Sequence, residues 1–170
     1  MKLETERLVL KSIDESRVDD ILKIRSNEIT NQFVKRIQPK TNYDALDFIL
    51  TIKKRVENKE TFYWGISLKN QTNLIGTICL YRFSVDRTEA EIGYELLPDY
   101  HRQGIMSEAL QAVLNFGFNE LNLNNILAFT NKFNENSKSL LLKHQFVLED
   151  GRIDEGFPEN LVFNKINIII

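Results

Sequence analysis

The first half of the chain shows helical spacing of apolar residues between segments of strand-like alternation. Two helices are predicted, one behind a possible capping box at residues 16–19 and one behind a second capping box at residues 41–44. Residues 7–13 carry β-branched and aliphatic side chains in loose alternation and predict a first strand. Residues 27–40 have no clear period, so we expect a loop between the two helices.

The second half changes to strand chemistry and then alternates strands with helices. Residues 62–69 and 74–83 flank a short polar turn and are followed by a third strand at 89–97, which predicts an antiparallel meander. The later elements are predicted to be a helix at 105–121, a strand at 125–131, a helix at 134–144, a strand that starts at 146 and a final strand at 161–170. The order predicts a mixed α/β chain with a late βαβ crossover.

Composition narrows the class of protein. A length of 170 residues predicts a single domain over residues 1–170, and 42% hydrophobic with 27% charged residues is typical of a globular chain. The 22 Lys and Arg residues against 24 Asp and Glu residues argue against nucleic acid or an anionic membrane as a partner. Cys79 is the single cysteine, which with two histidines leaves too few ligands for structural zinc, so no metal is expected. Without an apolar run of about 20 residues or a signal peptide, the expected location is the cytoplasm.

The run Glu89–Leu110 carries the most chemistry. Pro98 ends a strand, Gly104 permits a tight turn, and a helix begins at once. The backbone amides of Gln103–Ser107 are therefore expected to lack helical partners and to form an anion site suited to phosphate. His101 and Arg102 add donors beside it. Since many such turns bind nothing, a purely structural role is an equal alternative from spacing alone. Neither a P-loop motif nor a dinucleotide-binding glycine motif is present.

The same run, AEIGYELLPDYHRQGIMSEAL, resembles the acetyl-CoA-binding core of the GNAT N-acetyltransferases. It is most similar to the Rim-type branch, which acetylates the N-terminal amines of proteins. The family loop [QR]-x-x-G-x-[GA] falls on residues 101–106, where His101 and Met106 depart from the pattern.

Two further segments resemble the same branch. Residues 134–146 resemble the family helix N-x-x-S-x-x-L-L-x-K-x-G-F, with Gln145 in place of the glycine, and the opening TERLVLKSI at 5–13 is also similar. The resemblance implies the GNAT fold, an α/β architecture with a central, mostly antiparallel twisted sheet. About seven strands are expected, splayed after the fourth, with about four flanking helices.

The resemblance also implies direct attack of an amine on acetyl-CoA in a ternary complex, with acetyl-CoA as co-substrate. Strand amides would hold the pantetheine arm and the acetyl carbonyl, loop amides the phosphates, and Asn134 the CoA arm. The implied cofactor-binding residues are Tyr94, Glu95, Leu96, Leu97, His101, Arg102, Gln103, Gly104, Ile105, Met106, Ser107 and Asn134.

The catalytic candidates are one serine and three acids. Ser137 matches the family serine and is the candidate proton donor to the thiolate, with simple helix capping as an equal alternative. The candidate bases, acting directly or through water, are Glu91 and Glu95 on the strand predicted at 89–97 and Glu155 in the loop before the last strand. Glu155 lies about one residue from the position of the family's loop carboxylate. For each of these acids taken alone, a solvated surface carboxylate is the more common role.

The predicted function is acetyl transfer to a primary amine. The acceptor is either a protein N-terminal α-amine or a small amine such as a polyamine, an amino acid or an aminoglycoside. A non-catalytic acyl-CoA-binding module is the alternative from another class. A monomer or a homodimer is expected.

Overall fold

The computed structural model describes residues 1–167 and places eight strands in one sheet. The spatial order is β1-β2-β3-β4-β5-β6-β8-β7, and every neighbouring pair is antiparallel except β5 and β6. The strands are β1 (Lys2–Glu4), β2 (Leu8–Lys11), β3 (Phe62–Leu68), β4 (Gly76–Tyr81), β5 (Glu89–Leu96), β6 (Asn125–Asn131), β7 (Val147–Leu148) and β8 (Asn160–Ile166).

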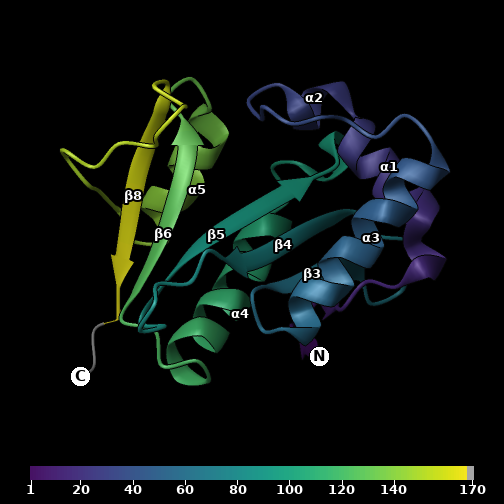
Figure 1. Cartoon of the computed structure of the whole chain (residues 1–170), viewed down its shortest axis with the longest axis horizontal. Helices are drawn as coiled ribbons and strands as arrows, with labels where there is room; N and C mark the ends of the chain where they lie inside the picture. The colour runs from purple at the N-terminus through teal and green to yellow at the C-terminus, as the bar shows by residue number, and fades with distance from the viewer. Residues whose placement is uncertain (168–170) are drawn as a thin grey trace.

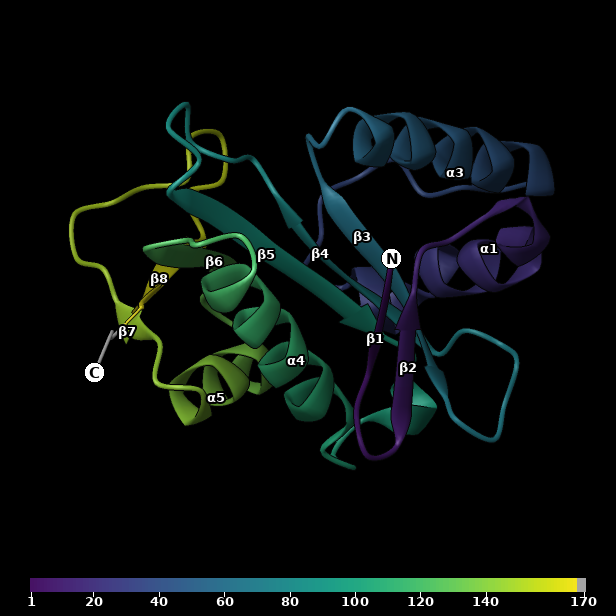
Figure 2. The same cartoon turned by 90° about the horizontal axis from the view of Figure 1, so that it is seen from below.

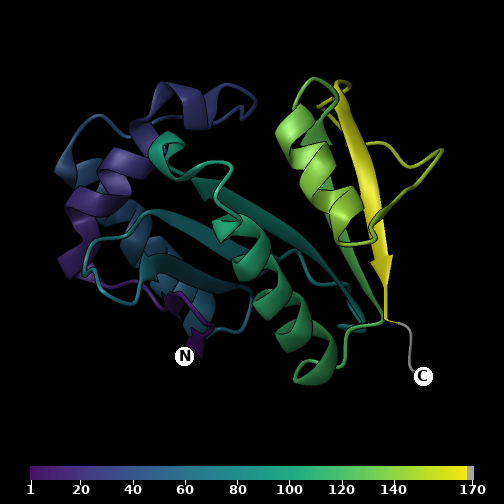
Figure 3. The same ribbon diagram turned by 180° about the vertical axis from the view of Figure 1, so that it is seen from behind.

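Helices cover both faces of this sheet. They are α1 (Val18–Ser26), α2 (Glu28–Asn31), α3 (Asn42–Glu57), α4 (Ile105–Asn119) and α5 (Glu135–Lys143), with short 3₁₀ turns η1 (Glu15–Arg17) and η2 (Pro98–Tyr100). Figure 2 shows α1 and α3 on one face, and Figures 2 and 3 show α4 and α5 on the other. Each face has its own apolar cluster, with Trp64 and Leu110 buried on the α4 side and Ile21 and Ile49 on the α1 and α3 side.

The sheet opens between its two parallel strands. The register of β5 with β6 runs from Glu89↔Asn125 to Ile92↔Ala128, and β6 then continues paired with β8 as far as Asn131↔Asn160. The last residues of β5 remain paired with β4, up to Gly76↔Leu96. The carboxyl ends of β5 and β6 therefore diverge (Figure 1), which confirms the expected splay.

Two details at the N-terminal end differ from the prediction. The expected strand at 7–13 is one arm of a hairpin, because Thr5 N donates to Leu8 O (3.1 Å) and turns the chain back, so the sheet has an eighth strand. The first helix does not begin with a capping box at residues 16–19. Asp14 instead accepts from Ser16 N (2.9 Å) and caps η1, after which α1 starts at Val18.

Other element predictions agree with the structure or are refined by it. The capping box of α3 is present with Thr41 and Asp44 as its partners. The segment 27–40 contains the short helix α2, which is capped by Asn27, and otherwise forms a loop. The final strand was predicted over residues 161–170, and in the structure β8 ends at Ile166. Residues 168–170 of that prediction lie outside the described residues.

Gln145 ends α5 in a left-handed conformation, with φ of 63°. Phe146 N donates to Leu141 O (3.0 Å) and Gln145 N to Leu142 O (2.9 Å), which is the Schellman pattern that glycine favours. A Cβ in this conformation costs roughly 1–2 kcal/mol, partly offset because glycine has a more flexible unfolded state. We expect Gln145→Gly to stabilise the fold by about 1 kcal/mol and to raise Tm by roughly 2–4 °C in thermal denaturation.

The matched control for this substitution is Gln71→Gly, in the exposed turn between β3 and β4. Gln71 is not among the residues with positive φ, so glycine there relieves no strain and Tm should stay the same or fall. A lower Tm for Gln145→Gly than for the parent protein would contradict the assignment of strain to Gln145.

Candidate functional site

The loop between β5 and α4 presents its backbone to one side. Arg102 and Gly104 both have left-handed φ, 59° and 74°, and Gly104 is the N-cap of α4. Glu108 N donates to Gly104 O (3.0 Å), which is the first backbone hydrogen bond of the helix. The amides before Glu108 therefore point out of the helix end, where the helix dipole adds positive potential. This arrangement suits a phosphate group.

The side chains of this loop are largely engaged elsewhere. His101 Nε2 lies 2.9 Å from Leu96 O, which turns the imidazole back onto the end of β5. The Gln103 side-chain amide donates to a carbonyl of η2 (2.8 Å). Ile105 and Met106 are buried in the α4-side core. The backbone amides and the Arg102 side chain, which lines the cavity described below, are therefore the groups of this loop that remain available to an anion.

Ser107, in the first turn of α4, connects this helix to α5. Its Oγ lies 2.8 Å from His144 Nε2. Burial and the nearby lysines Lys143 and Lys165 lower the pKa of His144, so the imidazole is neutral at pH 7. This contact joins the start of α4 to the C-cap of α5.

The end of β5 offers two of the four amides predicted to hold the pantetheine arm. Leu97 N already donates to Ile75 O (2.9 Å), on the β4 side. In an antiparallel ladder, alternate residues direct their amides to opposite sides. The amides of Tyr94 and Leu96 are therefore directed toward the splay, whereas that of Glu95 faces β4 like that of Leu97.

A cavity of about 440 Å³ lies at the splay. It brings together the end of β5, the loop 101–107 and the first turns of α5, which are the three segments that the sequence singled out. Its remaining wall is α2 with the loop after it, which the sequence left as a segment without period. The residues of that wall are Ile29, Thr30, Gln32, Phe33 and Val34.

Tyr94 and Ser137 meet across this cavity. Tyr94 Oη lies 2.8 Å from Ser137 Oγ, and both residues line the cavity. Asn134 Oδ1 accepts from Ser137 N (3.1 Å), so Asn134 caps α5 and the Ser137 hydroxyl is left to Tyr94. Burial raises the pKa of Tyr94 to about 12, so its phenol carries a proton at pH 7.

The side chain of Tyr94 is a feature that sequence reasoning missed. Strand alternation alone puts it on the face of Ile92 and Leu96, and those residues pack with α4. This alternation could have shown which face of the sheet the Tyr94 side chain occupies. It could not have shown the contact with Ser137 on α5, because that contact depends on how far β5 and β6 diverge.

Glu95 faces the other side of the sheet and is held by cations. Its carboxylate accepts from Arg36 Nη2 (2.5 Å), Arg25 Nη1 (3.5 Å) and Thr77 Oγ1 (3.1 Å), with only 9% of its side chain exposed. Arg36 also donates to Asn31 Oδ1 (2.7 Å). This network fastens α1 and the loop after α2 to the end of β5, and it carries two positive charges against one negative charge.

The other two candidate bases do not line the cavity. Glu91 pairs with Arg82 (3.3 Å) on the paired half of β5, and burial raises its pKa. Glu155 is exposed in the turn that Phe157 N closes onto Asp154 O (2.9 Å). The structure therefore brings Glu95 to the cavity and leaves Glu91 and Glu155 outside it.

Residues 1–167 contain neither a candidate membrane span nor a candidate metal cluster. Within this range no helix is both long and apolar enough to cross a membrane. The same residues contain no cluster of three or more His, Cys, Asp or Glu arranged to hold a metal ion.

The sheet opens between its two parallel strands, and outward-facing amides at the start of α4 lie at this opening, an arrangement that suits a CoA-dependent acyltransferase. The profile of the GNAT acetyltransferase domain matches residues 7–147. The chain belongs to this family and is an acetyltransferase, which confirms the resemblance found in its motifs.

Individual relatives agree with this assignment. The Bacillus subtilis protein named "uncharacterized N-acetyltransferase YoaA" is 33% identical over 147 residues, covering 86% of this chain and 83% of YoaA. The ribosomal-protein-S5-alanine acetyltransferase of Vibrio fischeri superposes with a TM-score of 0.82 at 22% identity, covering 99% of this chain and 97% of its own. RimL, a ribosomal L7/L12 α-N-protein acetyltransferase solved with coenzyme A, superposes with a TM-score of 0.83 at 18% identity, and 98% of each chain is covered. The fold is thus shared with enzymes of the Rim-type branch.

Proposed function

We propose that this protein transfers the acetyl group of acetyl-CoA to the α-amine of a polypeptide N-terminus. This choice of acceptor rests on the pairing of the Glu95 carboxylate with Arg25 and Arg36, which leaves it unsuited to act as a base. Among the described residues that line the cavity it is the one carboxylate, and two arginines hold it. A site without a free base suits an amine that is already partly neutral. An α-amine with a pKa near 8 is about one fifth neutral at pH 7.4, whereas a lysine side chain is about 0.1% neutral.

The cavity fits acetyl-CoA by the chemistry of its walls. The outward amides of Gly104–Ser107 suit the pyrophosphate, and the Tyr94 and Leu96 amides suit the pantetheine arm and the acetyl carbonyl. Arg102 and Lys143 also line the cavity and are cationic. Bound there, acetyl-CoA supplies a thioester carbon open to a nucleophile and a thiolate as leaving group.

Ser137 and Tyr94 supply the proton for that thiolate in this proposal. Ser137 Oγ donates to the departing sulfur while Tyr94 Oη, 2.8 Å away, donates to Ser137. Solvent takes up the proton that the amine nitrogen loses after its attack and returns a proton to Tyr94, so the net products are the amide and the CoA thiol. The demand on this pair is modest, because a thiol with a pKa around 8.5 is a good leaving group.

The charges around Glu95 act on the acceptor amine. Arg25 and Arg36 against Glu95 leave one positive charge in excess beside the cavity. A nearby positive charge disfavours an ammonium ion and so favours the neutral, nucleophilic amine. The network also fixes the loop after α2, which forms the acceptor-side wall.

A thiol-release assay with acetyl-CoA and matched peptides tests this proposal. Peptides with a free N-terminus should be turned over, with kcat/KM rising through about pH 8 as the α-amine loses its proton. The same peptides blocked at the N-terminus but containing lysine are the control and should be inert. Turnover of polyamines, aminoglycosides or free amino acids with peptides left untouched would contradict the choice of acceptor. Tight CoA binding without turnover of any amine would favour a binding module.

A further inference from the structure

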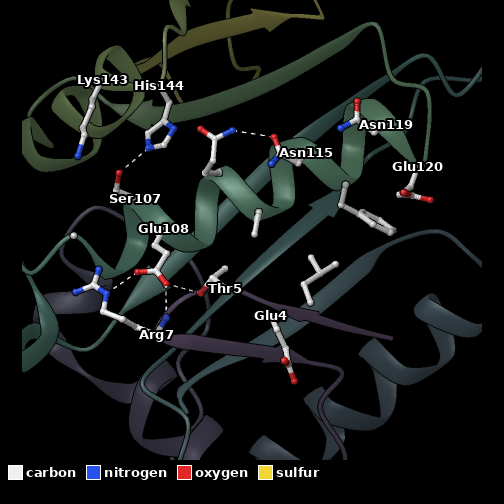
Figure 4. A pocket seen from close by; sticks show the side chains of 15 residues that line it. Glu4, Thr5, Arg7, Ser107, Glu108, Asn115, Asn119, Glu120, Lys143 and His144 are labelled. Atoms are coloured by element: carbon white, nitrogen blue, oxygen red, sulfur yellow. Dashed lines mark hydrogen bonds and ion pairs between the residues drawn. The ribbon is translucent and has the colours of Figure 1, made fainter. Parts of the chain in front are cut away.

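The opening segment Thr5–Ile13 resembles the family, yet the proposed mechanism gives it no role. In the structure its first residues lie against α4, beside a surface groove of about 790 Å³. The groove is bounded by the β1–β2 hairpin, one side of α4 and the end of α5 (Figure 4). Thr5 and Arg7 point from the hairpin toward Glu108 on α4.

Glu108 gathers donors from both hairpin residues. Its Oε1 accepts from Thr5 Oγ1 (2.5 Å) and Arg7 N (2.8 Å), and its Oε2 accepts from Arg7 Nε (2.6 Å). Thr5 Oγ1 in turn accepts from Leu8 N (3.0 Å), which closes the hairpin turn. Partial burial acts to raise the pKa of Glu108, but the bonds from Thr5 and Arg7 outweigh it and lower the pKa. The carboxylate is thus charged and satisfied by the hairpin.

Arg7 also reaches the loop between β5 and α4 (residues 97–104), called the phosphate-binding loop below after its proposed role. Its Nη1 donates to Gln103 O (3.0 Å), and a Cβ built on Gly104 would lie 3.4 Å from its Nη2. The guanidinium therefore joins the loop to the first turn of α4. It holds the stretch that contains Arg102, whose left-handed φ of 59° is strained for a residue with a side chain and persists only where neighbours enforce it.

The negative charge of Glu108 gives its ion pair with Arg7 a second role at the phosphate site. A carboxylate in the first turn of α4 lies close to the amides that would hold the pyrophosphate, and it would repel that group. Arg7 neutralises it at 2.6 Å. Loss of Arg7 would free the loop and also leave an uncompensated negative charge beside the phosphate site.

We propose that Arg7 is a positioning residue for acetyl-CoA, which shapes the phosphate-binding loop through Gln103 O and neutralises Glu108. This role rests on the proposed use of acetyl-CoA. It acts on binding of the CoA phosphates and not on the reacting atoms.

The test is CoA affinity by calorimetry together with steady-state kinetics. Arg7→Ala should raise the Kd for CoA and the KM for acetyl-CoA about 10- to 100-fold, with kcat at saturation within about twofold. Arg7→Lys should recover part of the affinity, because it keeps the charge but lacks the planar fork that spans both partners. Glu108→Gln should weaken binding less than Arg7→Ala, since it removes the repulsive charge along with the tether.

Lys53→Ala is the matched control, because it removes an ion pair of the same length, 2.6 Å to Glu15, on the other face of the sheet. Its CoA affinity should equal that of the parent protein. If Arg7→Ala folds and keeps the parental Kd for CoA and KM for acetyl-CoA, this inference is overturned but the proposed function is not. The same conclusion follows if Arg7→Ala lowers only kcat. If Arg7→Ala fails to fold, unchanged CoA affinity in both Arg7→Lys and Glu108→Gln would overturn it equally. No CoA binding by the parent protein would overturn the proposed function as well.

Discussion

Gly104→Glu should abolish CoA binding, with Kd raised at least about 100-fold. Gly104 has φ of 74°, which strains any side chain, and its Cβ would meet Arg7 Nη2 at 3.4 Å. A glutamate there adds bulk and a negative charge at the N-cap of α4, where outward amides and the helix dipole favour an anion. Calorimetric titration with CoA measures the loss, and circular dichroism checks that the variant is folded.

Gly151→Glu is the control for this substitution. Gly151 also has positive φ, 90°, with nothing within 4 Å of its Cβ position, and it does not line the cavity. It should carry the same kind of strain and the same charge with CoA affinity unchanged. Gly104→Ala separates strain from charge and should weaken CoA binding less than Gly104→Glu. Parental affinity in a folded Gly104→Glu would place the phosphates elsewhere.

The backbone geometry of the loop between β5 and α4 was predictable because its determinants are local. Pro98 stops the strand, Gly104 allows left-handed φ, and the helix starts at the next residue, all within one short segment. The amides that result need no distant partner to be correctly directed. Even so, the sequence did not show that the His101 side chain turns back to Leu96 O, since that contact depends on the path of η2.

Side-chain roles that depend on distant partners were not predictable in the same way. The Glu95 carboxylate was a reasonable candidate base from its strand position. Its partners Arg25 and Arg36 are 70 and 59 residues away in the sequence, so their contact exists only once α1 and the loop after α2 pack on β5. Glu155 was chosen from its place in the sequence relative to the family's loop carboxylate. The turn before β8 instead leaves it exposed outside the cavity.

The two faces of the sheet divide the proposed reaction between them. Alternation along β5 puts Tyr94 on the α4 and α5 face and Glu95 on the α1 and α3 face. The cavity at the splay is lined by both residues. In the proposed reaction the thiolate proton therefore comes from one face of the sheet, and the charge that acts on the amine comes from the other.

Ser137→Ala should lower kcat about 100-fold with CoA affinity within about twofold of the parent protein. General acid catalysis contributes roughly 10²- to 10⁴-fold, and a thiolate leaving group places the effect at the low end. The substitution keeps the cap of α5, because Asn134 Oδ1 accepts from the backbone N of residue 137. Stopped assays of thiol release at saturating acetyl-CoA measure the loss, and thermal denaturation should show little change in Tm.

Tyr94→Phe should lower kcat about tenfold, because it removes the hydroxyl 2.8 Å from Ser137 Oγ but leaves the serine in place. If the two hydroxyls act as one unit, the double variant should be no slower than Ser137→Ala alone. Ser67→Ala, on β3 with a weak bond to Val9 O (3.4 Å), is the control and should keep parental turnover. Parental kcat in Ser137→Ala would instead mean that solvent protonates the thiolate, and the Tyr94 contact would then serve only to join β5 to α5 across the splay.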